Sequence, residues 1–310
     1  MTKNVLITGA SGFVGGALLN HLQTKKGYRL TGVDIRVPPG RRPSAFYQLD
    51  LLDTKALTDF LRQRRPQVIF HLAGGRSSDL QKMFLTNVQT TKNIFESMGR
   101  LKDYHPRVLV VGSAAEYGNR LKRNLIKEND SQLCEDSYGL TKLTQIRIAL
   151  FHARLGEDVV VARLFNILGP GIPPTMVGGR FAKEIVKLEQ DPNRDDFTVR
   201  NLQAVRDFLD IRDIASALRL LAGKGRSGEI YNVCSQKAVP VKKLLSWMLA
   251  MSHRKKIKYQ EDASNASGVL FSVGSNKKFI QATGWQPKYD LRKSIRDTLE
   301  FYRQEDGKRS

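Results

Sequence analysis

A short apolar run, a glycine-rich turn and a helical segment follow one another near the start of the sequence, and this order constrains the fold most strongly. The run ends in Thr8, and Ala17–Leu22 is predicted to be helical. Between them, Gly9, Gly12 and Gly15 let the chain turn sharply, let backbone approach a pyrophosphate and let the helix pack closely on the strand. The helix N-terminus then presents free N–H groups and its positive dipole end to phosphates. A merely flexible glycine-rich turn is the alternative.

An acidic residue ends the second predicted strand, Arg29–Asp34. At this place Asp34 can bind the diol of an adenosine ribose, and its carboxylate would repel a 2′-phosphate. Arg36 lies two residues further on, and arginine suits a phosphate. We therefore predict NAD(H) as the favoured cofactor and keep NADP(H) as possible.

Further apolar runs alternate with helical segments along the first half of the chain. Continuous apolar runs suit strands that are buried on both faces of a parallel sheet. We expect strands at Val68–Ala73, Val108–Ser113 and Val159–Phe165. Such alternation predicts an α/β fold with a doubly wound parallel sheet, whose ligands bind at the carboxyl ends of the strands.

The second half of the chain is less regular. After Phe165 it contains proline-rich loops, shorter helical segments and one late strand, Ile230–Val233. From Val239 onward we expect short helices mixed with turns. We predict a dinucleotide-binding domain formed by residues 1–165 and 206–234. Residues 166–205 and 235–310 would form a smaller, interleaved substrate-binding domain.

Tyr138 and Lys142 are four residues apart in a predicted helix, Tyr138–Leu155, and therefore share one helix face. An ammonium beside the phenol would lower the pKa of Tyr138 toward neutrality, so that the phenol could donate and accept a proton near pH 7. The alternative is an exposed pair without a catalytic role. Ser113 ends a predicted strand and could donate a hydrogen bond to developing negative charge.

Taken together, these motifs resemble those of the extended short-chain dehydrogenase/reductases, the NAD-dependent nucleotide-sugar epimerase/dehydratase family. The resemblance spans essentially the whole chain, and its second half is most similar to reductases of GDP-4-keto-6-deoxymannose. It implies a Rossmann fold and hydride transfer between a nicotinamide and a sugar carbon. The motifs that carry it are Thr8-Gly9-x-x-Gly12-x-x-Gly15, Asp50-Leu51, His71-Leu72-Ala73-Gly74, Asn87, Ser113, Tyr117-Gly118, Tyr138-x-x-x-Lys142, Arg163-Leu164-Phe165-Asn166 and Arg206-Asp207-Phe208-Leu209-Asp210.

The resemblance also implies roles for individual residues. Tyr138 would protonate the sugar oxygen, Ser113 would donate a hydrogen bond to it, and Lys142 would lower the pKa of Tyr138 and bind the nicotinamide ribose. The expected cofactor-binding residues are Gly9, Gly12, Phe13, Val14, Gly15, Asp34, Ile35, Arg36, Asp50, Leu51, Leu72, Ala73, Gly74, Asn87, Tyr138, Lys142 and Leu164. The expected substrate-binding residues are Ser113, Asn166, Arg180 and Arg206. For Arg180 a plain surface arginine is the alternative.

One departure from the family pattern narrows the activity. The sugar 4,6-dehydratases carry acidic residues directly after the hydroxyl residue, whereas this chain has Ala114 and Ala115. Water elimination is therefore not expected. An epimerase would use the same Ser, Tyr and Lys and stays open. Glu116 stands where the family more often has an apolar residue, and the sequence offers no interpretation of it.

The composition bears on partners. The net charge is +21 and the pI about 10.1, a field that attracts nucleic acid or anionic surfaces. The basic residues are scattered in short groups, however, which favours a generally basic surface over nucleic-acid binding. No apolar run is long enough for a membrane span. Cys134 and Cys234 are expected to be reduced in a cytoplasmic protein, no metal site is indicated, and a homodimer is expected from the apolar helix faces.

Three functions compete at this point. The first is a reductase acting on the 4-keto group of a GDP-linked 4-keto-6-deoxy sugar. The second is a nucleotide-sugar 4-epimerase with tightly bound NAD. The third is a non-catalytic relative that senses dinucleotides or binds nucleic acid, against which the retention of Ser113, Tyr138 and Lys142 speaks.

Overall fold

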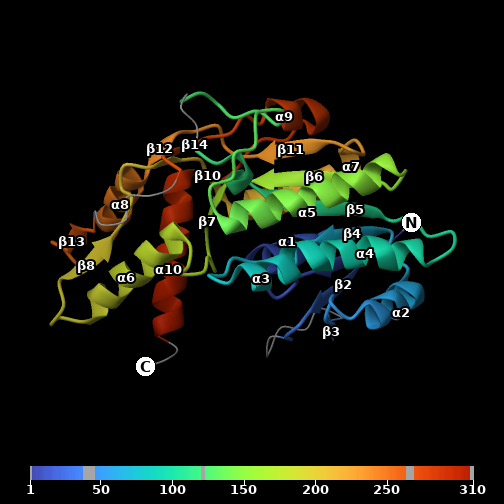
Figure 1. Cartoon of the computed structure of the whole chain (residues 1–310). Coiled ribbons are helices and arrows are strands. Elements are labelled where there is room, and N and C mark those ends of the chain that lie inside the picture. Colours follow the sequence, from blue (N-terminus) through green and yellow to red (C-terminus); the bar gives the residue numbers. More distant parts are fainter. Residues whose placement is uncertain (1, 38–45, 120–122, 263–268, 308–310) are drawn as a thin grey trace.

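A parallel seven-stranded sheet forms the larger part of the molecule (Figure 1). The computed structural model describes residues 2–37, 46–119, 123–262 and 269–307. The strand order is β11-β6-β5-β4-β1-β2-β3, with every neighbouring pair parallel. The strands are β1 (Lys3–Thr8), β2 (Tyr28–Asp34), β3 (Phe46–Gln48), β4 (Val68–His71), β5 (Arg107–Ser113), β6 (Val159–Leu164) and β11 (Ile230–Val233).

Helices cover both faces of this sheet, and each face has its own apolar core. One face carries α1 (Phe13–Gln23), α7 (Ile211–Lys224) and α9 (Lys277–Thr283). The other carries α2 (Thr54–Arg64), the short α3 (Leu80–Met83), α4 (Thr90–Gly99) and α5 (Ser137–Arg154). The predicted α/β fold with a doubly wound parallel sheet is thereby confirmed.

The smaller part lies beyond the carboxyl ends of the strands, on the left in Figure 1. It has a separate apolar core. Its helices are α6 (Val177–Gln190), α8 (Val241–Ala250) and α10 (Leu291–Asp306). Its strand pairs and small sheet comprise β7 (Asn166–Leu168) with β10 (Phe208–Asp210), β8 (Asp196–Val199) with β13 (Lys258–Glu261), and β9 (Val205–Arg206) between β12 (Val239–Pro240) and β14 (Phe271–Ser272).

Two segments differ from the sequence-based expectation. The final segment contains the 16-residue helix α10 instead of only short helices. Its apolar positions Leu291, Ile295 and Leu299 recur every fourth residue and form one face, with the latter two fully buried. Helix α9 lies in the range predicted for the substrate-binding domain, but it packs against the sheet. Its residue Phe279, and Trp285 just after it, join the apolar core on the α1 face. The division into two domains otherwise stays a prediction.

The helical segment that contains Asn87, from Leu80 to Gly99, is interrupted by a wider turn. Residues Phe84–Gln89 form one π-helical segment, η1, between α3 and α4. Such segments are rare and recur at functional sites. Asn87 lies in this turn and is fully buried. No helix in the described part of the chain combines the length and apolar character that a membrane span needs.

Candidate active site

The glycine-rich turn between β1 and α1 is built around close backbone contacts. Gly9 has φ +64°, and a Cβ there would lie 2.7 Å from the amide nitrogen of Ala73. A Cβ at Gly15 would lie 2.1 Å from the carbonyl oxygen of Gly9, so only glycine lets α1 approach the turn. Gly12 is the N-cap of α1 and offers no side chain to its free N–H groups. The turn thus leaves a helix N-terminus open to a phosphate.

Thr8 and His71 join the carboxyl ends of β1 and β4 beneath this turn. The Thr8 hydroxyl oxygen lies 2.9 Å from His71 Nδ1 and accepts hydrogen bonds from the amides of Leu72 and Ala73, both at 3.2 Å. Burial, with the nearby charge of Lys142, lowers the pKa of His71 to about 3, so the imidazole is neutral. Sequence reasoning did not assign these two side chains a role. Their paired positions at adjacent strand ends are the signal that could have indicated it.

Asp34 lies beside the same turn, at the end of β2. One carboxylate oxygen accepts a hydrogen bond from the amide of Ser11 at 3.0 Å, and the other accepts from Ile35 at 2.8 Å. The carboxylate is therefore fixed beside the glycine turn, where the sequence places a ribose. The side chain of Ile35 is exposed, as is that of Arg36.

The remaining residues expected to contact the cofactor differ in how far their side chains are buried. Asp50 accepts a hydrogen bond from the amide of Leu52 at 2.9 Å, and the carbonyl oxygen of Leu51 accepts one from Asn93 at 2.8 Å. The side chains of Leu51 and Leu164 are buried in the two sheet cores, so these residues would offer mainly backbone to a ligand. The partly buried positions are Phe13, Val14, Leu72 and Ala73.

Ser113 and Tyr138 meet at the carboxyl end of β5. The Ser113 side chain lies close enough to the phenol of Tyr138, in the first turn of α5, to lower its pKa as a hydrogen-bond partner. The side chain of Asp136 caps this helix by accepting from the Gly139 amide at 2.7 Å. The guanidinium carbon of Arg76 lies 5.5 Å from the centre of the Tyr138 ring. The hydroxyl and the phenol are thus neighbours, which the roles implied by the family resemblance require.

The expected effect of Lys142 on Tyr138 is wrong in this structure. Burial raises the pKa of Tyr138, while the hydrogen bond from Ser113 and the charge of Arg76 only partly oppose this. The ammonium of Lys142 donates to the Val111 carbonyl at 2.6 Å and also contacts the side-chain oxygen of Gln145. Burial lowers the pKa of this ammonium to about 8.

Asn87 connects the loop after β4 to α5. Its side-chain oxygen accepts from the Gly75 amide at 2.8 Å, and its amide nitrogen donates to the Gly75 carbonyl and the Thr141 hydroxyl, both at 3.0 Å. Gly74 fits tightly there, because a Cβ would lie 2.6 Å from the Asn87 oxygen and 3.9 Å from the Lys142 ammonium. Asn87 therefore shapes the loop that follows β4, next to the expected ribose-binding lysine.

Of the other residues expected to bind substrate, two lie together and the third lies in a different element. Asn166 donates to the backbone carbonyl of Asp207 at 3.3 Å, so it lies beside Arg206 at the junction of the two parts. The Arg206 guanidinium donates to the backbone carbonyls of Val205 at 3.1 Å and Val269 at 2.5 Å. Arg180 instead belongs to α6 and donates to the carbonyl of Thr198 in β8 at 2.8 Å.

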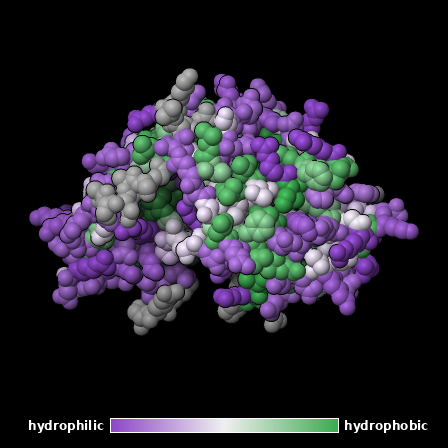
Figure 2. Space-filling model, in the orientation of Figure 1, coloured by the Kyte–Doolittle hydropathy of each residue, from purple (hydrophilic) through white to green (hydrophobic). Residues whose placement is uncertain are grey.

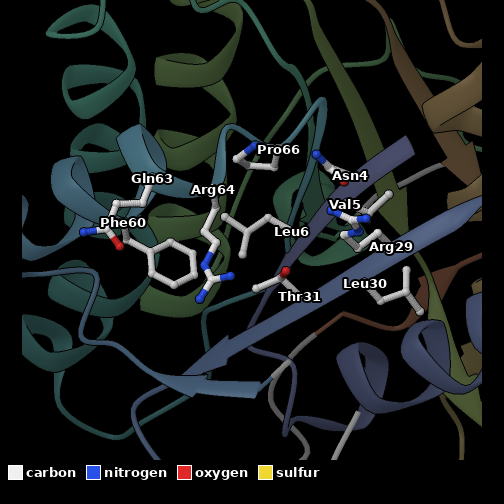
Figure 3. Close-up of a pocket in the computed structure, with 10 residues that line it drawn as sticks. All are labelled: Asn4, Val5, Leu6, Arg29, Leu30, Thr31, Phe60, Gln63, Arg64 and Pro66. Carbon is white, nitrogen blue, oxygen red and sulfur yellow. The ribbon is translucent and has the colours of Figure 1, made fainter. Parts of the chain in front are cut away.

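The surface is hollowed between the sheet and the smaller part (Figure 2). A separate cavity of about 470 Å³ lies at the amino ends of β1 and β2, opposite the glycine turn. In Figure 3, Phe60 and Arg64 extend from α2 over Leu6 and Thr31 of the strands. Ligands of doubly wound sheets bind at the carboxyl ends, so this cavity is not the candidate active site. Among the described residues, no three His, Cys, Asp or Glu side chains gather as a metal site would require.

Comparison with known proteins gives a consistent result. Residues 5–234 match the model of the "NAD dependent epimerase/dehydratase family". The chain is 28% identical to the GDP-6-deoxy-D-mannose reductase of Pseudomonas aeruginosa, over 96% of this chain and 97% of that protein. It is 27% identical to an uncharacterized UDP-glucose epimerase of Bacillus subtilis, over 95% of each. The solved structure of RMD from Pseudomonas aeruginosa complexed with NADPH superimposes with a TM-score of 0.86 at 26% identity, covering 98% of this chain and all of that one.

The match of the family model extends over most of the chain and includes the glycine turn, the Ser113–Tyr138 pair and Lys142. It also includes the buried strands that carry them. The chain therefore belongs to the NAD dependent epimerase/dehydratase family, and the expectation of an enzyme of the extended short-chain dehydrogenase/reductase type is confirmed.

Proposed function

We propose that this enzyme reduces the 4-keto group of a GDP-linked 4-keto-6-deoxyhexose with NAD(P)H. The observation that carries the proposal is the pair of Ser113 and Tyr138 at the end of β5, at the same edge of the sheet as the open N-terminus of α1. The 28% identical relative, which is a GDP-6-deoxy-D-mannose reductase, supports the choice of sugar and nucleotide.

The glycine cradle fits a nicotinamide dinucleotide, because side chains at Gly9 or Gly15 would fill it. When bound, the reduced cofactor supplies the hydride. Tyr138 gives its phenolic proton to the sugar oxygen as charge develops there, and Ser113 donates a hydrogen bond to the same oxygen. The raised pKa of Tyr138 keeps the phenol protonated, which is the form that reduction needs. Lys142 would hold the nicotinamide ribose.

Other residues would bind the rest of the ligands. Asn166 and Arg206 would hold the diphosphate of the substrate, and Arg180 the nucleotide side. Asp34 supports NAD(H), since its carboxylate is held by the Ser11 amide beside the glycine turn and would repel a 2′-phosphate bound next to it. NADP(H) is the second candidate, because the Pseudomonas aeruginosa structure carries NADPH. We also propose a homodimer formed through α4 and α5.

The test combines the purified protein, NAD(P)H and GDP-4-keto-6-deoxymannose. Loss of reduced-nicotinamide absorbance in step with sugar reduction supports the reductase. The second candidate is a 4-epimerase, which the 27% identical relative favours. It would instead copurify with NAD and interconvert two sugars without net oxidation of added cofactor. Absence of both reactions with every nucleotide sugar would overturn the proposed function.

A further inference from the structure

Glu116, which the sequence left uninterpreted, lies directly beneath the Ser113–Tyr138 pair. Ser113 is the N-cap of a short 3₁₀ turn, η2 (Ala114–Tyr117). Its hydroxyl accepts a hydrogen bond from the Ala115 amide at 3.2 Å. The carboxylate of Glu116 reaches back and accepts the Ser113 amide hydrogen at 2.6 Å. These two bonds form a capping box, which fixes the conformation of the serine that carries the hydroxyl.

Arg163 fixes that carboxylate from the neighbouring strand. Its Nε and one terminal nitrogen lie 2.8 Å and 2.7 Å from the same Glu116 oxygen, Oε2. Both side chains are completely buried. Residue 163 of β6 pairs with Gly112 of β5, and a Cβ at Gly112 would lie 2.5 Å from Glu116 Oε1. The sheet register and the glycine therefore create the space that the carboxylate occupies.

The guanidinium of Arg163 also forms a hydrogen bond away from Glu116. It donates to the hydroxyl of Tyr117 at 2.6 Å, and that hydroxyl donates to Asn232 of β11 at 2.8 Å. A buried ion pair is costly to desolvate, and an apolar pair of similar volume often stabilises a fold as well. Stability alone therefore gives little reason for a glutamate at position 116.

Both oxygens of Glu116 are engaged, one by the Ser113 amide and one by Arg163. The carboxylate is thus unsuited to the acid–base work of an elimination. Its charge nevertheless acts on the neighbouring groups, since it opposes the lowering of the Lys142 pKa by burial and adds to the raising of the Tyr138 pKa.

We propose that Glu116, held by Arg163, is a positioning residue that aims the Ser113 hydroxyl at the Tyr138 phenol and the reacting sugar oxygen. The inference rests on the proposed function, which it deepens by adding a residue that touches neither substrate nor cofactor. Without the carboxylate the capping box opens, and the serine can turn away from the phenol.

The test removes both charges at once, because a single change would leave the other charge buried and unpaired. In the variant Glu116→Val with Arg163→Met, we expect kcat to fall about 10²-fold, the usual effect of misplacing a reacting group. KM and the affinity for NAD(P)H should stay within about twofold, since no binding contact is removed. In a Ser113→Ala background the same double change should lower kcat no further, because its effect passes through the serine.

A control is the partly buried pair Glu189–Arg303 of the smaller part, at 2.7 Å. The change Glu189→Gln should lower the melting temperature and leave kcat unchanged. If the Glu116/Arg163 variant behaves in the same way, or adds fully to Ser113→Ala, the positioning role is overturned.

A readout without turnover separates this inference from the proposed function. The ¹³Cζ resonance of Tyr138, assigned with Tyr138→Phe, should shift when the Ser113 hydrogen bond is displaced by the Glu116/Arg163 change. An unchanged resonance overturns the inference even if wild-type protein is a reductase. A shifted resonance supports it even if the wild type reduces no GDP sugar, a result that refutes only the proposed function.

Discussion

The ammonium of Lys142 donates a hydrogen bond of 2.6 Å to the carbonyl oxygen of Val111, so that it ties α5 to β5 just before Ser113. In this position it is buried, and its pKa falls to about 8 as a result, although the charge of Glu116 opposes the fall. The lysine is therefore close to its titration point near neutral pH, which gives the enzyme a pH dependence that can be measured.

We expect kcat/KM to decrease as pH rises through about 8, where Lys142 loses its charge. Between about 8 and 10.5 the unfolded chain binds more protons at this group than the folded chain, so its contribution to folding stability rises with pH. Deprotonation of Lys142 therefore does not itself destabilise the fold over this pH range. In Lys142→Arg the guanidinium stays charged, and the residual activity should lack the limb. An identical limb in that variant would contradict the assignment.

Tyr138→Phe should lower kcat by about 10²–10⁴, the usual contribution of a positioned acid. Affinity for NAD(P)H, measured by fluorescence titration, should stay near that of the wild type. Tyr104→Phe is the control, since its buried hydroxyl donates to the Pro66 carbonyl at 3.0 Å far from the site. The Tyr104→Phe variant should have a lower stability, with kcat and cofactor affinity unchanged. A Tyr138→Phe protein that fails to fold or to bind cofactor would make the phenol structural.

Asp34→Ala should weaken NAD binding more than NADP binding. A hydrogen bond to a charged group contributes about 1.5–3 kcal/mol, so we expect roughly 10–100-fold for NAD. Isothermal titration with both cofactors measures the difference. Asp59→Ala is the control, because this carboxylate forms an exposed pair with Arg62 and should affect neither cofactor. Equal losses for NAD and NADP would remove Asp34 from the ribose site.

The proposed dimer predicts that charge on α5 separates the subunits. Phe151 in α5 is 57% exposed, and Leu155, the residue directly after this helix, is 64% exposed. Phe151→Glu should convert a dimer into a monomer in sedimentation analysis. Leu270→Glu, at a residue equally apolar and 50% exposed in the other part, should not. A wild-type protein that sediments as a monomer would refute the proposal.

Much of the fold could be predicted because buried parallel strands are continuous apolar runs. β11 has the predicted bounds Ile230–Val233, and β6 differs from its prediction by one residue. The glycine turn was recognisable because its glycines lie between an apolar run and a helical segment, and because Gly15 is required by a local contact with the Gly9 carbonyl. Helix α10 could also have been found, since its apolar residues recur every fourth position among the charges.

The electrostatics of the site could not be predicted in the same way. Spacing places Lys142 and Tyr138 on one helix face, but the partner of the ammonium, the Val111 carbonyl, comes from a strand distant in sequence. The role of Glu116 depends on the register that sets Arg163 opposite Gly112. Such contacts between neighbouring strands depend on tertiary packing. A residue pattern along the chain therefore does not predict them.

The wide turn at Phe84–Gln89 has a consequence for how this enzyme could change during evolution. It accommodates one residue more than a regular helix would over the same rise, and this surplus turns the Asn87 amide inward to Gly75. Deleting a single residue there would restore regular winding with the flanking turns in phase, but the Asn87 amide would no longer be directed to Gly75. Shortening this helix would therefore disconnect the loop after β4 from α5, so substitutions should be tolerated in this segment far more readily than changes in its length.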